Sequence, residues 1–171
     1  TEVENLTKRV AEILTQGERV VIKKGRYDLE MSIKGRKGIE STGRYLEKGQ
    51  SGNLPSGEAY IAPVEGSANG MLLVDGSIVG LGKLSSPILI EIRNGLLVSA
   101  HGENVEKWLT ILGDSESARN VGEFGIGTNP NARLTGNILE DEKILGTIHV
   151  AFGSNITFGG KVSAGVHLDA V

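Results

Sequence analysis

Glycine constrains this chain more than any other residue type. The chain holds 25 glycines against only 4 prolines in 171 residues, and the glycines follow no fixed period, which excludes a collagen-like fold. They separate short apolar runs, as turn and bulge residues do in sheet-rich domains. We therefore expect many short strands joined by tight turns. Strand-like runs lie at residues 18–24, 28–35, 58–64, 69–76, 86–95, 96–102, 121–127, 146–153 and 161–171, and a loop is expected over 35–52.

Two segments show helical rather than strand periodicity. Apolar residues recur at helical spacing over residues 3–16, and Gly17 is suited to cap the end of that helix. Residues 104–113 carry a second apolar stripe, in which we expect Trp108 to be a core anchor, and residues 115–120 add a helical turn. Helices and strands that do not alternate regularly predict an α+β domain. We expect an antiparallel or mixed sheet, or a barrel-like curl of it, with two or three helices.

Composition and charge exclude several classes of protein. Hydrophobic residues make up 39% and aromatics only 4%, so the core should be aliphatic, and the length suits one domain over residues 1–171. The net charge of −3 argues against a general binder of nucleic acids or membrane surfaces. The chain contains no cysteine, which excludes disulfides and thiolate catalysis. It has no apolar run of membrane-spanning length and no secretory signal, so we expect a cytoplasmic protein.

Five residues have side chains of the kind that bind metal ions, and each lies in a run of otherwise apolar or small residues. Carboxylates buried in such strands cost several kcal/mol unless a cation or another partner compensates them. Two candidates stand two residues apart near the end of the chain, so their side chains leave one face of a strand, roughly 7 Å apart at the backbone, and can converge on one or two ions. Imidazole and carboxylate ligands suit zinc, cobalt, manganese or iron(II). The candidates are Glu58, Glu123, His149, His167 and Asp169.

Four motifs around these candidates resemble a known family. In order, they are "NLPSGEAYIAP", "VGEFGIGTNP", "GTIHVAFG" and the final "HLD". Together they are similar to motifs of the aminopeptidase T (thermophilic aminopeptidase) family of metallopeptidases, which includes proteins called leucyl aminopeptidases. The similarity runs from about Gly25 to Val171. It implies that this chain corresponds to the C-terminal, metal-binding part of a two-domain protein, whose α/β N-terminal domain would precede it.

The resemblance also implies roles for the five residues. Glu58 matches the first metal-binding glutamate, and Glu123 matches the second, which is also a candidate to assist catalysis. His149, His167 and Asp169 match the remaining ligands. The implied activity is removal of N-terminal residues from peptides by a metal-activated water, the substrate is a peptide or a small molecule, and the expected assembly is a homodimer.

The chain departs from the family pattern at two places. The family has a metal-binding tyrosine seven residues after the middle histidine, where this chain has Ile156. Because an aliphatic side chain cannot bind a metal, we expect one ion to be held much more tightly than a second. The segment Asp141–Lys143 reads "DEK" where the peptidases have "DEN". We interpret residues 129–142 as a solvated loop, and we expect neither Asp141 nor Glu142 to be a ligand.

Two alternatives remain open at this point. His149, His167 and Asp169 form a two-histidine-one-carboxylate set, which is the ligand type of non-haem iron(II) oxygenases, and a related ring-cleaving dioxygenase resembles this chain at these positions. The other alternative is a non-catalytic domain that serves in assembly. The third histidine, His101, lies where the family has no ligand, and we expect it at the surface or at the start of a helix.

Overall fold

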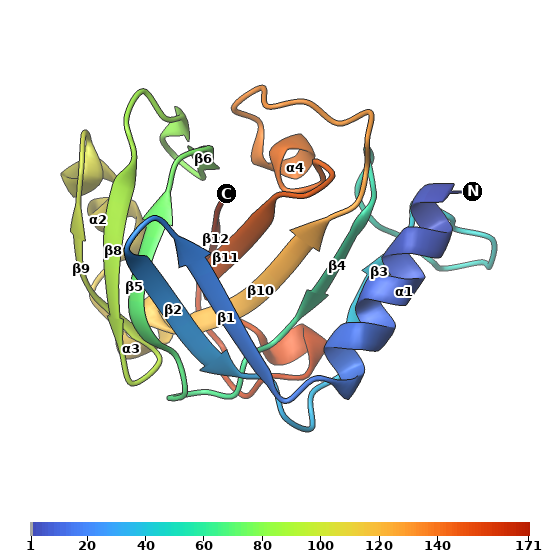
Figure 1. Cartoon of the computed structure of the whole chain (residues 1–171), viewed down its shortest axis with the longest axis horizontal. Coiled ribbons are helices and arrows are strands. Elements are labelled where there is room, and N and C mark those ends of the chain that lie inside the picture. Colours follow the sequence, from blue (N-terminus) through green and yellow to red (C-terminus); the bar gives the residue numbers. More distant parts are fainter. Residues whose placement is uncertain (1) are drawn as a thin grey trace.

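Strand pairing in the computed structural model, which describes residues 2–171, divides the chain into two sheets (Figure 1). The five-stranded sheet has the order β1-β2-β5-β8-β9, and the seven-stranded sheet has the order β3-β4-β10-β11-β12-β6-β7. The pairings between these strands are antiparallel, which confirms the α+β class, and neither sheet closes into a barrel. The strands are β1 (Arg19–Lys24), β2 (Tyr27–Ser32), β3 (Ile39–Ser41), β4 (Glu58–Ile61), β5 (Asn69–Val74), β6 (Ser77–Ile78), β7 (Gly82–Lys83), β8 (Ile88–Arg93), β9 (Leu96–His101), β10 (Val121–Gly127), β11 (Ile148–Gly153) and β12 (His167–Ala170).

Both predicted helices are present. The first, α1 (Glu2–Gln16), ends where the backbone N–H of Gly17 donates to the carbonyl of Ile13 at 2.9 Å, and it lies against β3 and β4 (Figure 1). The second is α2 (Val105–Leu112), and the predicted extra turn is α3 (Glu116–Arg119). Two further short elements are α4 (Ile138–Asp141) and a 3₁₀ turn (Ile156–Phe158). No helix among residues 2–171 is both long and apolar enough to cross a membrane.

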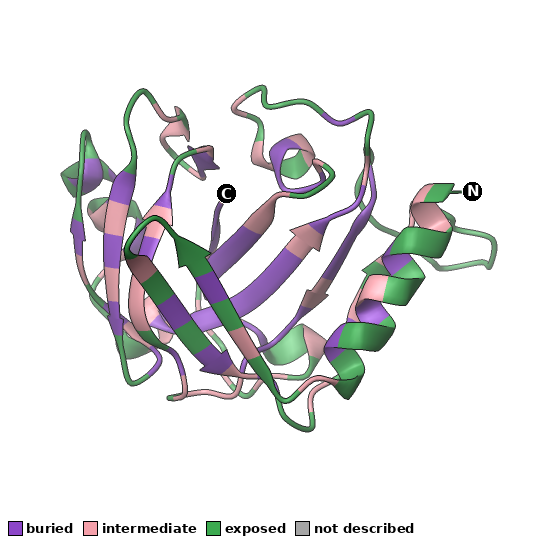
Figure 2. Cartoon of the chain, in the orientation of Figure 1, coloured by how far each residue is buried: buried purple, intermediate pink, exposed green. Residues whose placement is uncertain are grey.

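The two sheets share one aliphatic core, with Trp108 as the predicted anchor. Trp108 is fully buried and meets Phe152 of β11 edge-on, with ring centroids 5.8 Å apart. In the seven-stranded sheet the residues that face the core occupy alternate positions. These inward residues are Ala59, Ile61, Phe124, Val150, Phe152, Leu168 and Ala170. Both faces of the central strands of this sheet are covered, so Figure 2 shows β10 and β11 buried along most of their length.

The register of the central strands brings the other alternate positions together on the opposite face. Across β10 and β11, Gly125 faces His149, and across β11 and β12, Ala151 faces Asp169. Because facing residues point to the same side of a sheet, this register places all five candidate ligands on one face. The remaining facing pairs are Gly127 with Glu58, Glu123 with Ala151, and Gly153 with His167.

Three sequence predictions about local structure were wrong. The loop expected over 35–52 contains strand β3, and β12 begins only at His167, so residues 161–166 are not strand. The acidic end of the segment 129–142 is not solvated, because Asp141 is fully buried and Glu142 is only 6% exposed. The Asp141 carboxylate accepts hydrogen bonds from the backbone N–H groups of Thr135 and Gly136 at 2.7 and 2.9 Å, which explains its burial beside α4.

Candidate metal centre

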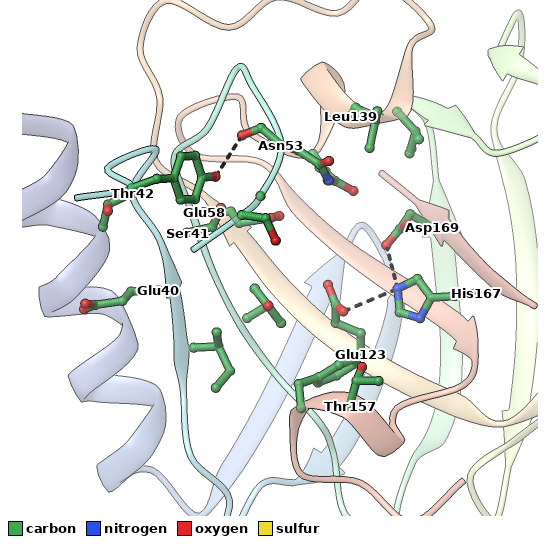
Figure 3. Close-up of a pocket in the computed structure, with 18 of the residues that line it drawn as sticks. Glu40, Ser41, Thr42, Asn53, Glu58, Glu123, Leu139, Thr157, His167 and Asp169 are labelled. Atoms are coloured by element: carbon green, nitrogen blue, oxygen red, sulfur yellow. Dashed lines mark hydrogen bonds and ion pairs between the residues drawn. The ribbon is translucent and has the colours of Figure 1, made fainter. Parts of the chain in front are cut away.

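Four of the five predicted ligands line one cleft on the face of the seven-stranded sheet opposite the core, and the fifth, His149, lies buried next to them. Figure 3 shows Glu58, Glu123, His167 and Asp169 turned toward a common space. All four line a cleft of about 870 Å³. His149 lies beneath them, only 1% exposed, with its Nε2 atom 3.1 Å from Oε1 of Glu123. The strand pattern thus brings residues from β4, β10, β11 and β12 into one site.

These residues form two neighbouring groups, each with ligand atoms within 4.8 Å of one another. We call Glu123, His167 and Asp169 the His167 cluster. We call Glu58, Glu142 and His149 the Glu58 cluster. Each cluster therefore holds one imidazole and two carboxylates, and the donor set suits a divalent transition metal.

In the His167 cluster the imidazole is fixed from behind. Its Nδ1 atom donates to the carbonyl of Ser154 at 2.8 Å, which leaves Nε2 directed at the carboxylates. Nε2 lies 3.4 Å from Oε2 of Glu123 and 3.7 Å from Oδ1 of Asp169 (Figure 3). The ring also meets Phe158 edge-on, with centroids 5.9 Å apart. A backbone acceptor behind the ring and carboxylates in front of it are the usual setting of a metal-binding histidine.

The Glu58 cluster contains a cation of its own. Oε2 of Glu58 lies 3.5 Å from Nε2 of His149, while Oε1 of Glu58 lies 3.0 Å from Nζ of Lys143. Nζ of Lys143 also pairs with Oε1 of Glu142. Lys143 is fully buried, so its ammonium is shielded from solvent and forms ion pairs with these two carboxylates.

Gly125 makes room for the His149 ring. It faces His149 across the β10–β11 ladder, and a Cβ atom at this position would lie 2.1 Å from Nε2 of His149. No real contact is that short, so any larger residue would displace the imidazole. The glycine in the "EFGIG" run of β10 is therefore a packing requirement of the site as well as a feature of the strand.

Opposed electrostatic effects set the protonation of His149 and His167. Burial disfavours the imidazolium, but Glu123 and the other carboxylates outweigh it and raise the pKa of His149 to about 9. In the same way, Asp169 and Glu123 overcome burial and raise the pKa of His167 to about 11. Burial would raise the pKa of Glu123, yet hydrogen bonds to the two histidines lower that pKa to about 2. Protons on the imidazoles thus compensate the carboxylates of the metal-free site.

Two carboxylate oxygen atoms give the most direct support for a metal-binding site. Oε2 of Glu58 and Oδ1 of Asp169 are buried and form no hydrogen bond within the described residues. Buried anionic oxygens without a donor are costly. Each belongs to one of the two clusters, so a divalent cation bound there would satisfy both the charge and the missing contacts.

Sequence reasoning missed Glu142 and Lys143. Both follow α4 directly. Glu142 lines the cleft, and burial raises the pKa of its carboxyl to about 7. The only sequence signal was the "DEK" segment itself, since nothing local predicts that it folds against β4. Two other predictions concern residues outside the clusters: His101 is exposed on β9, as expected, and Ile156 is 51% exposed and does not line the cleft.

Comparisons with known proteins identify a family and a shared fold. The model of the thermophilic metalloprotease (M29) family matches residues 1–165. Among solved structures, 2,5-dihydroxypyridine dioxygenase from Pseudomonas putida KT2440 is similar with a TM-score of 0.84 and 23% identity, over 99% of this chain and 54% of that chain. Wild-type AmpT from Thermus thermophilus is similar with a TM-score of 0.75 and 24% identity, over 96% of this chain and 46% of that chain.

At these identities the two structures show a shared fold, and the chain spans about half the length of each. A search of curated proteins gave no match.

Proposed function

Because this chain belongs to the thermophilic metalloprotease (M29) family, we propose that it carries the metal site of an aminopeptidase-like hydrolase, which removes N-terminal residues from peptides. One observation carries the proposal: four carboxylates and one imidazole line one cleft, and a second imidazole, that of His149, is buried against them. The proposed metal ligands are Glu123, His167 and Asp169, with Glu58 and His149 beside them, and the proposed ion is zinc, cobalt or manganese. When bound, such an ion polarises the scissile carbonyl and lowers the pKa of a water molecule.

The carboxylates of the site have different protonation behaviour, which suggests different roles. Glu123 has a pKa of about 2 after the histidine contacts overcome burial, so it stays ionised and suits a ligand better than a proton acceptor. Burial, with Asp169 and Glu58 adding to it, raises the pKa of Glu142 to about 7, which is the range of an efficient general base at neutral pH. We assign Glu142 to accept the proton of the attacking water, at the carboxylate oxygen that Lys143 does not pair with.

Two apolar parts of the cleft lining support a peptide substrate with an apolar first residue. Tyr60 and Phe158 meet edge-on, with centroids 5.4 Å apart, and form one apolar side above His167. Ile138 and Leu139 of α4 line the cleft as well, and Leu139 is 44% exposed. We propose that an aliphatic side chain of the substrate packs between these walls. A carboxylate at the floor would then accept hydrogen bonds from the free α-ammonium.

The dioxygenase alternative is supported by the fold similarity to 2,5-dihydroxypyridine dioxygenase. It requires His149, His167 and Asp169 to act as one set. In the structure His149 groups with Glu58 and Glu142, and Glu123 lies between the two imidazoles. We therefore place the hydrolase ahead of the dioxygenase, with metal identity as the deciding measurement.

The test measures which metal ion supports which reaction. Metal-free protein is loaded with zinc, cobalt, manganese or iron(II), and each form is assayed for release of the first residue from leucyl-peptides and for oxygen uptake with dihydroxypyridines. Release of free leucine, abolished by N-acetylation of the peptide, is the expected result. Oxygen uptake with iron(II) alone would support the dioxygenase, and failure to bind any of these metals would support a non-catalytic domain.

A further inference from the structure

Lys143 places a permanent positive charge inside the Glu58 cluster. Its Nζ atom contacts one carboxylate oxygen of Glu58 and one of Glu142, and no part of the residue is exposed. The backbone fixes the residue on both sides: its N–H donates to the carbonyl of Glu140 at 2.9 Å, and its carbonyl accepts from the N–H of Asn129 at 2.8 Å. The ammonium is therefore held in place by the fold and cannot turn to solvent without local unfolding.

The ammonium engages the ligands that a metal ion in this cluster would need. Two of the three members, Glu58 and Glu142, already share Nζ as their counter-ion. Metal–carboxylate bonds are about 2.0–2.2 Å long, so an ion bound to these oxygens would lie within a few ångströms of the ammonium. Two cations at such a distance repel strongly in a site with little water.

The His167 cluster has no such cation among residues 2–171. The ion pairs of Glu123 and Asp169 are with histidines, which can lose their protons to become metal ligands. A lysine beside two carboxylates has no such role, because its ammonium donates hydrogen bonds and offers no lone pair. The two clusters thus differ in one respect that decides where a metal ion binds.

Charge balance is consistent with this difference. The four carboxylates of the two clusters carry four negative charges when ionised, which two divalent ions would neutralise in the absence of another cation. With the imidazoles counted as neutral, Lys143 and a single divalent ion leave one residual negative charge. With Lys143 in place, a second ion is therefore not needed to bring the site within one charge of neutrality.

We infer that Lys143 is a resident cation that substitutes for a second metal ion, so that this protein binds one divalent ion, in the His167 cluster. The inference rests on the proposed metal-binding function. It also replaces the reason we drew from Ile156, which lies outside the cleft.

Metal titration of the whole chain tests this. Calorimetry with zinc and cobalt, and metal analysis after dialysis, should give one equivalent for the unmodified protein and two for Lys143→Met. The matched control is Lys107→Met, which removes an exposed lysine on α2 and should leave one equivalent. Asp169→Asn should remove the single equivalent of the unmodified protein, which locates the ion.

Each outcome decides the inference. Two equivalents in the unmodified protein, or one in folded Lys143→Met, overturn it. Binding of no metal by any variant contradicts the proposed function instead. If circular dichroism shows that Lys143→Met is unfolded, Lys143→Gln replaces it. If that variant is also unfolded, the stoichiometry of the unmodified protein decides: two equivalents overturn the inference, and one that Asp169→Asn removes supports it.

Discussion

Nε2 of His149 lies 3.1 Å from Oε1 of Glu123, while the other oxygen of Glu123 lies 3.4 Å from Nε2 of His167. This single carboxylate joins the two clusters, because each of its oxygens faces a different imidazole. A change at His149 should therefore reach the His167 cluster through Glu123, even if His149 does not bind the ion.

The three histidines should differ in their effect on metal affinity. We expect His167→Ala to weaken zinc binding by at least ~100-fold, because it removes a ligand, and His149→Ala to weaken it by roughly tenfold through Glu123. His101→Ala should leave the affinity unchanged, since His101 is exposed on β9. Competition with a coloured chelator measures all three. Equal losses for the three variants would contradict the assignment of the site.

Gly125→Ala should destabilise the protein by about 1–3 kcal/mol, because the added Cβ meets the imidazole of His149 in a packed strand. Urea unfolding of metal-free protein measures this free energy. Gly165→Ala is the matched control, since a Cβ there has no heavy atom within 4 Å, and we expect a change within about 0.5 kcal/mol. Similar stability for the two variants would show that the His149 ring moves aside at little cost.

The metal-free protein should lose stability as the pH rises. The folded-state pKa of His149 is raised to about 9, so its contribution is fully present below about pH 6.5 and is lost as the pH rises through 9. The pKa of Glu142 is raised to about 7 by burial, so its contribution to stability is fully present below about pH 4.5 and is lost as the pH rises through 7. The lowered pKa of Glu123 has the opposite effect on stability, because its contribution is lost as the pH falls, but only below about pH 4.5.

We therefore expect the melting temperature of metal-free protein to fall by at least ~5 °C between pH 6 and pH 9. Differential scanning calorimetry at constant ionic strength measures this. His101→Ala should keep the same slope, and saturating zinc should flatten it because the metal replaces the protons. A melting temperature that rises over this range would contradict a protonated His149 in the metal-free site.

Glu65 should support the wall of the cleft from a distance. Its carboxylate accepts from the backbone N–H of Lys161 at 2.7 Å and from Nδ2 of Asn155 at 3.2 Å, and it pairs with Arg36. These contacts hold the segment that carries Phe158. We expect Glu65→Ala to cost about 1–3 kcal/mol by leaving donors unpaired, and to raise KM more than it lowers kcat.

Glu18→Ala is the control for that variant. Its ion pair with Lys34 is about two-thirds exposed on both sides, and such pairs contribute little. We expect its removal to change the unfolding free energy by less than about 0.5 kcal/mol. Chemical denaturation of both variants, together with peptide kinetics, measures the difference. Equal effects would show that Glu65 has no special role in holding the cleft wall.

Strand periodicity indicated which side chains of a single strand share a face, whereas the grouping of Glu58, Glu123, His149, His167 and Asp169 from four strands came from the family resemblance. In the structure the register of β4, β10, β11 and β12 puts these five residues on one face. Glu142 and Lys143 could not be assigned from periodicity, because they follow a one-turn helix. Their burial depends on contact with Glu58, which lies far away in the sequence. The aliphatic core was predicted from composition, and Trp108 from the helical spacing of its segment.

From Glu123 onward the central strands divide their residues by parity: alternate residues face the core, and the residues between them face the cleft side. The irregularity between Val121 and Glu123 in β10 lies before this stretch. Most substitutions at core-facing positions should therefore act on stability, and most at site-facing positions on chemistry, whereas Gly125 affects both because His149 packs against it. Insertions and deletions affect both faces at once, because a shift of one residue in β11 would send His149 into the core and Val150 into the site. Descendants of this sequence should thus vary freely in length at the turns and in the loops above the cleft, while the lengths of β10, β11 and β12 stay fixed.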